Sequence, residues 1–153
     1  MRAQDYARAL YKYIDIDAPP IRIEPIIEAL GIELREDDFD NLNGFAFKKA
    51  DERMIMVNRS LPPERKRFAI AHELGHIVMP HKGPYHVCFQ GRPSRMEKDA
   101  DRFAAELLMP EPTVRRVWER YKDNVEYRVS ILAERFEVSR AAMAIRVRRL
   151  GLK

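Results

Sequence analysis

The chain has 153 residues, of which 46% are hydrophobic and 34% charged, enough apolar material for the core of one domain. This composition excludes a disordered chain, and the sequence contains no run of 18 apolar residues that would predict a transmembrane helix. Residues 1–17 carry charges throughout and lack the apolar segment of a signal peptide. The single cysteine, Cys88, excludes an internal disulfide. We therefore expect a cytoplasmic protein that makes no membrane contact.

The net charge of +4 hides an asymmetry along the chain. Residues 1–112 hold 17 basic and 19 acidic side chains, whereas residues 113–153 hold 11 basic and 5 acidic ones. The basic character therefore belongs to the C-terminal tail. Such a run of charge is most often a solvated helix surface, although it also permits contact with nucleic acid.

The first part of the chain predicts short helices followed by strands. Apolar spacing predicts two helices, over residues 3–13 and 23–31. Runs of β-branched and aromatic residues then predict three strands, over residues 32–36, 44–48 and 53–58. The last two of these strands are expected to form a hairpin.

The rest of the chain predicts helices, over residues 64–79, 95–109, 114–122, 126–136 and 140–149. Ser60, Thr113 and Ser139 stand where the N-caps of the first, third and last of these helices would lie. Residues 81–94 contain two Gly and two Pro and predict a loop. Strands grouped early and helices grouped late indicate the α+β class, with a small antiparallel sheet packed on the helices.

Residues 72–76 read His-Glu-Leu-Gly-His within the first of these long helices. Residues four apart on a helix share a face, so His72 and His76 can hold one Zn²⁺ from the same side. Glu73 lies about 100° round from His72 by the helical period, too far to be a natural third ligand but near enough to reach a water on the metal. The pattern arises by chance in roughly one chain in 200 of this length, so the sequence predicts a metal site.

A catalytic zinc needs a third protein ligand and an open fourth position. Metzincins continue with a glycine and a third histidine, but Met79 and Lys82 occupy those positions here, which excludes that class. The next helix offers Glu97 and Asp101, which are four residues apart and share a face. With Glu97 as ligand, Asp101 can accept the second N–H of a ligating imidazole and fix its tautomer.

Two alternatives for this helix stay open on spacing alone. Ser94-Arg95-Met96-Glu97 matches a capping box, in which Glu97 only closes the N-terminus of the helix. Asp99 is a substitute for Glu97 as the third ligand, although it points about 200° away from it.

These residues closely resemble the ImmA/IrrE family of zinc metallo-endopeptidases. The resemblance rests on the helix motif, on EKDADRFAAELLMP at 97–110 and, more weakly, on RFEVSRAAMAIRVRRLGL at 135–152. In that family the Glu three residues before the Ala of the second block is the third ligand, which here is Glu97. The position after that Ala is usually Asn or Asp and is Asp101 here. The resemblance thus implies a gluzincin arrangement with ligands His72, His76 and Glu97.

The chemistry expected of such a site is peptide hydrolysis. Zn²⁺ would lower the pKa of its bound water and polarise the scissile carbonyl, while Glu73 would take the proton and pass it to the leaving amine. Three side chains of the predicted loop are candidates for stabilising the oxyanion, although each is more commonly a bystander: His81, Tyr85 and His86. The strand at 53–58 offers an edge along which an extended peptide can pair.

We expect a zincin-like metallopeptidase domain over residues 1–112 and a basic helical subdomain over residues 113–153. The last two predicted helices, with Val-Ser-Arg at the turn, resemble a helix-turn-helix. Four arginines there can contact phosphate, namely Arg140, Arg146, Arg148 and Arg149. Packing of these helices onto the peptidase is the interpretation we favour, because recognition of DNA needs a basic face and not only basic residues.

Three functions follow. The resemblance implies a site-specific cytoplasmic endopeptidase, whose substrate is typically a helix-turn-helix repressor of a mobile element or a toxin–antitoxin-like operon. The alternatives are a metal-binding, DNA-associated regulatory protein with little or no peptidase activity and a peptidase of broad specificity. We favour the first, because a protease in the cytosol must be restrained, and narrow specificity restrains it.

Overall fold

The computed structural model describes residues 1–81, 83, 85–89 and 94–153, and for residues 85–89 it describes the backbone only. The helices are α1 (Ala3–Arg8), the 3-10 helix η1 (Tyr11–Tyr13), α2 (Glu24–Ala29), α3 (Pro63–Val78), α4 (Arg95–Leu108), α5 (Glu111–Arg120), α6 (Arg128–Phe136) and α7 (Arg140–Arg149). The strands are β1 (Glu33–Asp37), β2 (Leu42–Lys49), β3 (Glu52–Asn58) and β4 (Tyr85–Phe89). The class is α+β, as predicted.

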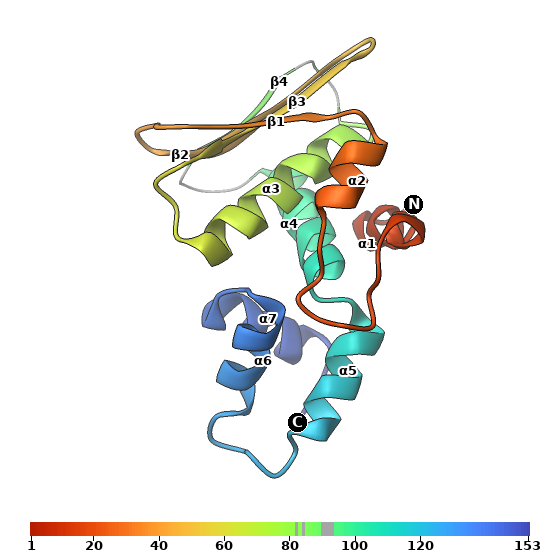
Figure 1. Cartoon of the computed structure of the whole chain (residues 1–153), viewed down its shortest axis with the longest axis vertical. Coiled ribbons are helices and arrows are strands. Elements are labelled where there is room, and N and C mark those ends of the chain that lie inside the picture. The colour runs from red at the N-terminus through yellow and green to blue at the C-terminus, as the bar shows by residue number, and fades with distance from the viewer. Residues whose placement is uncertain (82, 84, 90–93) are drawn as a thin grey trace.

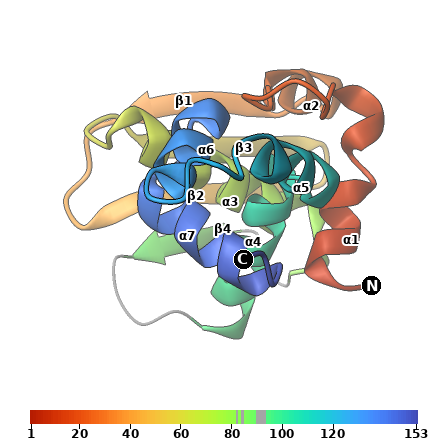
Figure 2. The same cartoon turned by 90° about the horizontal axis from the view of Figure 1, so that it is seen from below.

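The elements form three layers (Figure 1). The sheet lies at the top of that view, α3 and α4 lie beneath it with α1 and α2 at their side, and α5, α6 and α7 form the bottom layer. Seen from below, the last three helices lie across the middle layer (Figure 2). The metal-site motif is therefore carried by the layer that both other layers cover.

The sheet has the order β1-β3-β2-β4, and two predictions about it are wrong. It is mixed, not antiparallel, because β1 pairs with β3 in parallel while β2 pairs with β3 and β4 antiparallel. The predicted β2–β3 hairpin is confirmed, with Phe45 opposite Met56. Strand β3 is central, so both of its edges are already paired and neither is open to a peptide.

Strand β4 lies inside residues 81–94, which were predicted as a loop. Its five residues include aromatic and β-branched ones that favour a strand, but the surrounding Gly and Pro dominate the composition. Pairing with β2 is a contact between distant segments, which local propensity does not report. Strands β1 and β4 are the two outer strands of the sheet.

Two helices begin after a proline and not at the serine or threonine predicted to cap them. Helix α3 begins after Pro62 and not at Ser60, and α5 begins after Pro110, three residues before the predicted first helical residue. Proline fixes φ at a helical value and lacks the N–H that a first turn leaves unbonded, so it starts these helices in place of a side-chain cap. Thr113 lies inside α5, where its hydroxyl donates to the carbonyl of Ile16. Ser139 does cap α7, because its hydroxyl accepts the N–H of Ala142.

One apolar core runs through the layers. It is contiguous from the sheet through the middle layer to the C-terminal helices, and its fully buried members include Ile55, Leu74, Phe103, Leu107, Leu132, Phe136 and Met143. The core continues across position 112, so the boundary between residues 1–112 and 113–153 stays a prediction, as does the helix-turn-helix character of α6 and α7. None of the helices that the structure describes is both long and apolar enough to cross a bilayer.

Gly75 brings α3 and α4 together. A Cβ at this position would lie 2.9 Å from Cδ1 of the buried Phe103 ring on α4 and 3.3 Å from Cε of Met79. Glycine costs a helix interior about 1 kcal/mol relative to alanine. The close approach of the two helices explains why that cost is tolerated here.

We predict that Gly75→Ala destabilises the fold, because overpacking costs about 1–3 kcal/mol and outweighs the helix-propensity gain. The free energy of unfolding from denaturant titration measures the change. In a Phe103→Leu background, which frees space opposite Gly75, the same substitution should cost less. Equal costs in both backgrounds would show that the contact with Phe103 is not what requires glycine.

Candidate metal centre

Helices α3 and α4 bring three potential metal ligands to one point. His72 and His76 are one helical turn apart on α3, with Nε2 atoms 3.2 Å apart. Glu97, from the first turn of α4, places Oε1 2.6 Å from Nε2 of His76 and Oε2 3.1 Å from Nε2 of His72. Both histidines are buried, whereas the Glu97 side chain is half-buried. The group is therefore open on the Glu97 side.

The donor atoms of this group fit a divalent cation. One atom from each of the three side chains lies within 4.8 Å of the other two. Two imidazole nitrogens and one carboxylate oxygen make a ligand set that zinc accepts, and it leaves room for a further ligand. Other divalent ions also accept this set, so the donors indicate a metal site and not one element.

The Nδ1 atoms of His72 and His76 both contact other side chains, and the Nε2 atoms of the two rings therefore face Glu97. Nδ1 of His72 lies 2.7 Å from Oδ1 of Asp101, one turn along α4 from Glu97. A carboxylate accepts a hydrogen bond from Nδ1–H, so this contact selects the tautomer whose Nε2 carries a lone pair. Nδ1 of His76 lies 2.8 Å from Nδ1 of His81.

The acidic side chains make this a site for positive charge. Burial lowers the pKa of His72, but hydrogen bonds to the carboxylates of Asp101 and Glu97, with the nearby Glu73 charge, raise it to about 10. The same carboxylates favour a metal cation in this place.

The first turn of α4 decides between the two alternatives, Glu97 as a capping residue only and Asp99 as the third ligand. The Ser94 hydroxyl accepts the N–H of Glu97 at 3.2 Å, so Ser94 is the N-cap. The Glu97 side chain turns to the two histidines and not back to the Ser94 backbone, so only half of the capping box forms. Asp99 lies 3.5 Å from Arg102 on the exposed side of α4, away from the histidines.

Glu73 is a fully buried carboxylate beside these ligands. Strand β2 makes room for it at Gly44, where a Cβ would lie 2.5 Å from the Met56 carbonyl oxygen and 3.5 Å from Oε2 of Glu73. Asn43, the preceding residue, lines the same cleft as Glu73. Asn43 is not among the site residues predicted from the sequence, and its only local signal is an Asn-Gly pair at the start of a predicted strand.

The three oxyanion candidates have different outcomes. His81 lies behind His76, on the side opposite Glu97, so the structure gives it a position that orients His76 and does not face a substrate. Tyr85 and His86 belong to β4, and their side chains lie outside the described residues. Their role stays a prediction.

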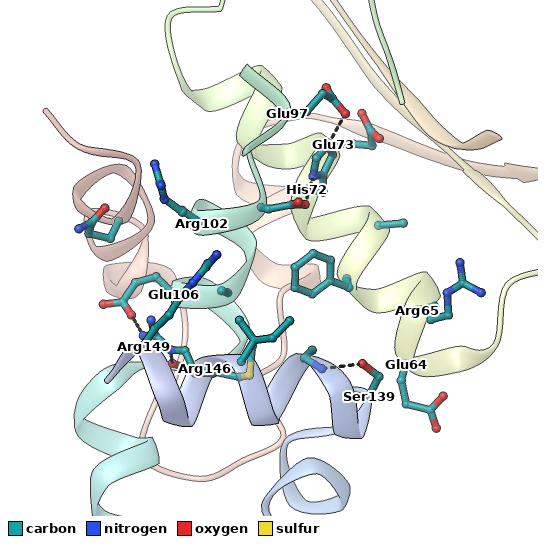
Figure 3. Close-up of a pocket in the computed structure, with 18 of the residues that line it drawn as sticks. Glu64, Arg65, His72, Glu73, Glu97, Arg102, Glu106, Ser139, Arg146 and Arg149 are labelled. Atoms are coloured by element: carbon teal, nitrogen blue, oxygen red, sulfur yellow. Dashed lines mark hydrogen bonds and ion pairs between the residues drawn. The ribbon is translucent and has the colours of Figure 1, made fainter. Parts of the chain in front are cut away.

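A cleft of about 840 Å³ opens next to the metal-site group. Figure 3 shows His72, Glu73 and Glu97 at one end of it and α7 along the other. A cleft of this size holds a small molecule or a short segment of polypeptide.

Comparison with known proteins points to one family. The family model of the IrrE N-terminal-like domain, in the M78 peptidases, matches residues 27–148. The radiation response metalloprotease IrrE of Deinococcus radiodurans is 32% identical over 97 residues, which are 58% of this chain and 29% of that protein. The match thus spans less than a third of that relative's length.

We predict that metal binding depends on this group in a graded way. After zinc loading and dialysis, His76→Ala should hold no zinc, as measured by elemental analysis, because a ligand is gone. Asp101→Asn should bind zinc about 10- to 100-fold more weakly, because only the support of His72 is lost.

Asp99→Asn is the matched control, since it removes the same charge from the same helix away from the histidines. It should bind zinc as the wild type does. A larger loss for Asp99→Asn than for Glu97→Gln would contradict the assignment of the third ligand.

Proposed function

This chain belongs to the ImmA/IrrE family, through its IrrE N-terminal-like peptidase domain, and from that premise we propose that it is a zinc-dependent endopeptidase. The observation that carries the proposal is the convergence of His72, His76 and Glu97 beside the buried carboxylate of Glu73, at one end of a large cleft. Metal ligands alone suit a structural site. A carboxylate next to them, at the wall of a cleft, suits hydrolysis.

His72, His76 and Glu97 would hold the zinc ion, which when bound supplies Lewis-acid chemistry that acidifies water and polarises a carbonyl oxygen. Glu73 supplies the proton transfer. It follows His72 directly on α3, so its carboxylate reaches the cleft from the side of the ligand pair. From there it accepts a proton from a water molecule that attacks the peptide carbonyl and donates it to the nitrogen of the leaving amine.

Asp101 acts through His72. Its carboxylate holds Nδ1 at 2.7 Å, which keeps Nε2 directed towards the ligand group. His81 does the same for His76 from the other side. Both are positioning residues, because neither contacts the place where the peptide bond would lie.

The proposed substrate is a cytoplasmic helix-turn-helix repressor of a mobile element or a toxin–antitoxin-like operon, and the family membership supports this choice. The relative from Deinococcus radiodurans is named a radiation response metalloprotease. A DNA-associated regulatory role is less well supported. Arg146, one of the four arginines considered for phosphate contact, is ion-paired with Glu106 within the fold.

We predict that Glu73→Gln abolishes cleavage while zinc is retained. The glutamine amide keeps the size of the side chain but accepts no proton, so the rate should fall at least about 100-fold. The wild type and the variant, both zinc-loaded, would be incubated with the helix-turn-helix repressor encoded next to this chain's gene, and the products analysed by mass spectrometry.

Zinc content and thermal stability of Glu73→Gln are the controls, and both should match the wild type. Fragments of the repressor that appear equally with both proteins would overturn the role of Glu73. Intact repressor with both proteins would favour the regulatory alternative.

A further inference from the structure

The cleft extends well beyond the metal-site group. It is walled by α3, α4 and α7, and Figure 3 shows α7 lying opposite the metal end. The chemistry at Glu73 needs only the scissile bond and its nearest neighbours. The rest of the cleft is therefore available for recognising residues further along a substrate.

Two arginines that pair with one buried carboxylate fix α7 as the far wall of this cleft. The Glu106 carboxylate on α4 is 1% exposed and bonds Arg8 of α1, at 2.6 Å, and Arg146 of α7. Nε of Arg146 also donates to the carbonyl oxygen of Met109 at 3.0 Å. Breaking a buried pair of this kind is costly, so the cluster holds α7 in one position against α4.

Three other arginines project at this cleft from three different helices. They are Arg65 of α3, Arg102 of α4 and Arg149 of α7, and all are exposed. Figure 3 labels each of them around the space between the metal end and α7. Among the ion pairs of the described residues, Arg102 makes one long contact, 3.5 Å to the partly exposed Asp99, and Arg65 and Arg149 make none.

The acidic side chains of the cleft do not cancel this charge. Glu73, Glu97 and Asp101 belong to the metal end, and Glu106 and Glu111 are ion-paired with Arg8. That leaves Glu64, at the start of α3, as the carboxylate facing three guanidinium groups. The distal cleft is thus positively charged.

Apolar side chains form the base of the same region. Partly buried ones come from each wall, and they are Phe68, Ala105, Ala142 and Leu150. Ile145 of α7 is 41% exposed there, unusual for a large aliphatic side chain. A base of this kind with a cationic rim suits a polypeptide that carries both apolar and acidic side chains.

We propose that this distal cleft binds an acidic segment of the protein substrate, with Arg65, Arg102 and Arg149 as its specificity-determining residues. The inference rests on the proposed peptidase function and adds the class of sequence that the enzyme selects. The guanidinium groups pair with Asp or Glu side chains further along the substrate from the scissile bond, while Phe68 and Ile145 contact apolar residues between them.

Nucleic acid is the other polyanion that arginines recognise. The apolar base of the cleft and its continuity with the metal end favour a peptide, because a phosphate backbone gains nothing from either feature. Arg146 and Arg149 of α7 line the cleft, and Arg146 is paired with Glu106. The four arginines considered for phosphate contact therefore do not form one basic face.

Binding of synthetic peptides tests the proposal. Short fluorescent peptides with one common apolar centre would carry runs of glutamate, glutamine or lysine at their ends. A short DNA duplex would serve as a fourth probe. Anisotropy titrations would use the zinc-loaded Glu73→Gln protein, so that no peptide is cut during the measurement.

We expect the glutamate peptide to bind at least about tenfold more tightly than the glutamine peptide at physiological ionic strength, and the lysine peptide to bind more weakly still. The triple variant R65E/R102E/R149E should lose this preference. The control R53E/R120E/R148E reverses as many exposed charges outside the cleft and should keep it.

Equal binding of the three peptides, or equal effects of the two triple variants, would overturn the proposal. The proposal would also be overturned if the DNA duplex bound more tightly than the glutamate peptide and only R65E/R102E/R149E removed that binding. If the wild type cleaves the repressor and R65E/R102E/R149E cleaves it equally well, the cleft proposal alone is refuted. Selective binding of the glutamate peptide, with no cleavage of the repressor by the wild type, would instead refute the peptidase function and leave the acidic preference of the cleft intact.

Discussion

The close packing of α3 against α4 at Gly75 is the contact on which the site depends. Helix α3 alone presents two imidazoles on one face, and α4 alone begins with a capped acidic turn. Only when the backbone of α3 lies against the Phe103 ring does Glu97 reach both histidines. The same approach places Asp101 behind His72. The absence of a side chain at Gly75 therefore allows the close approach of the two helices. That approach brings four polar side chains together, those of His72, His76, Glu97 and Asp101.

This dependence explains which features the sequence predicts well. His72, His76, Glu97 and Asp101 are related by fixed helical spacings, so their grouping follows from two local patterns once the helices meet. The half-formed capping box at Ser94 shows the limit of such reasoning. The spacing matches both a cap and a ligand, and only the position of α3 decides that the Glu97 side chain turns away from its own backbone.

Features formed by distant segments were not predictable in this way. The parallel pairing of β1 with β3, and β4 within a Gly- and Pro-containing stretch, arise from contacts that no local window contains. The excess of basic residues in the tail is plain in the sequence, but its placement is not. Glu106 fixes α7 through Arg146, and that contact turns Arg149 and Ile145 towards the cleft. Charge that would suggest a nucleic-acid surface then lies beside a proposed peptide-binding site.

The central claim is that His72, His76 and Glu97 hold a catalytic zinc beside Glu73. X-ray absorption at the zinc edge of the loaded protein tests it most directly, because the spectrum reports the elements bound to the metal. The account predicts nitrogen and oxygen neighbours only, at about 2.0–2.2 Å, with the outer-sphere pattern of two imidazoles. A sulfur neighbour at about 2.3 Å, which would place Cys88 on the zinc, or a pattern of three imidazoles, would contradict it.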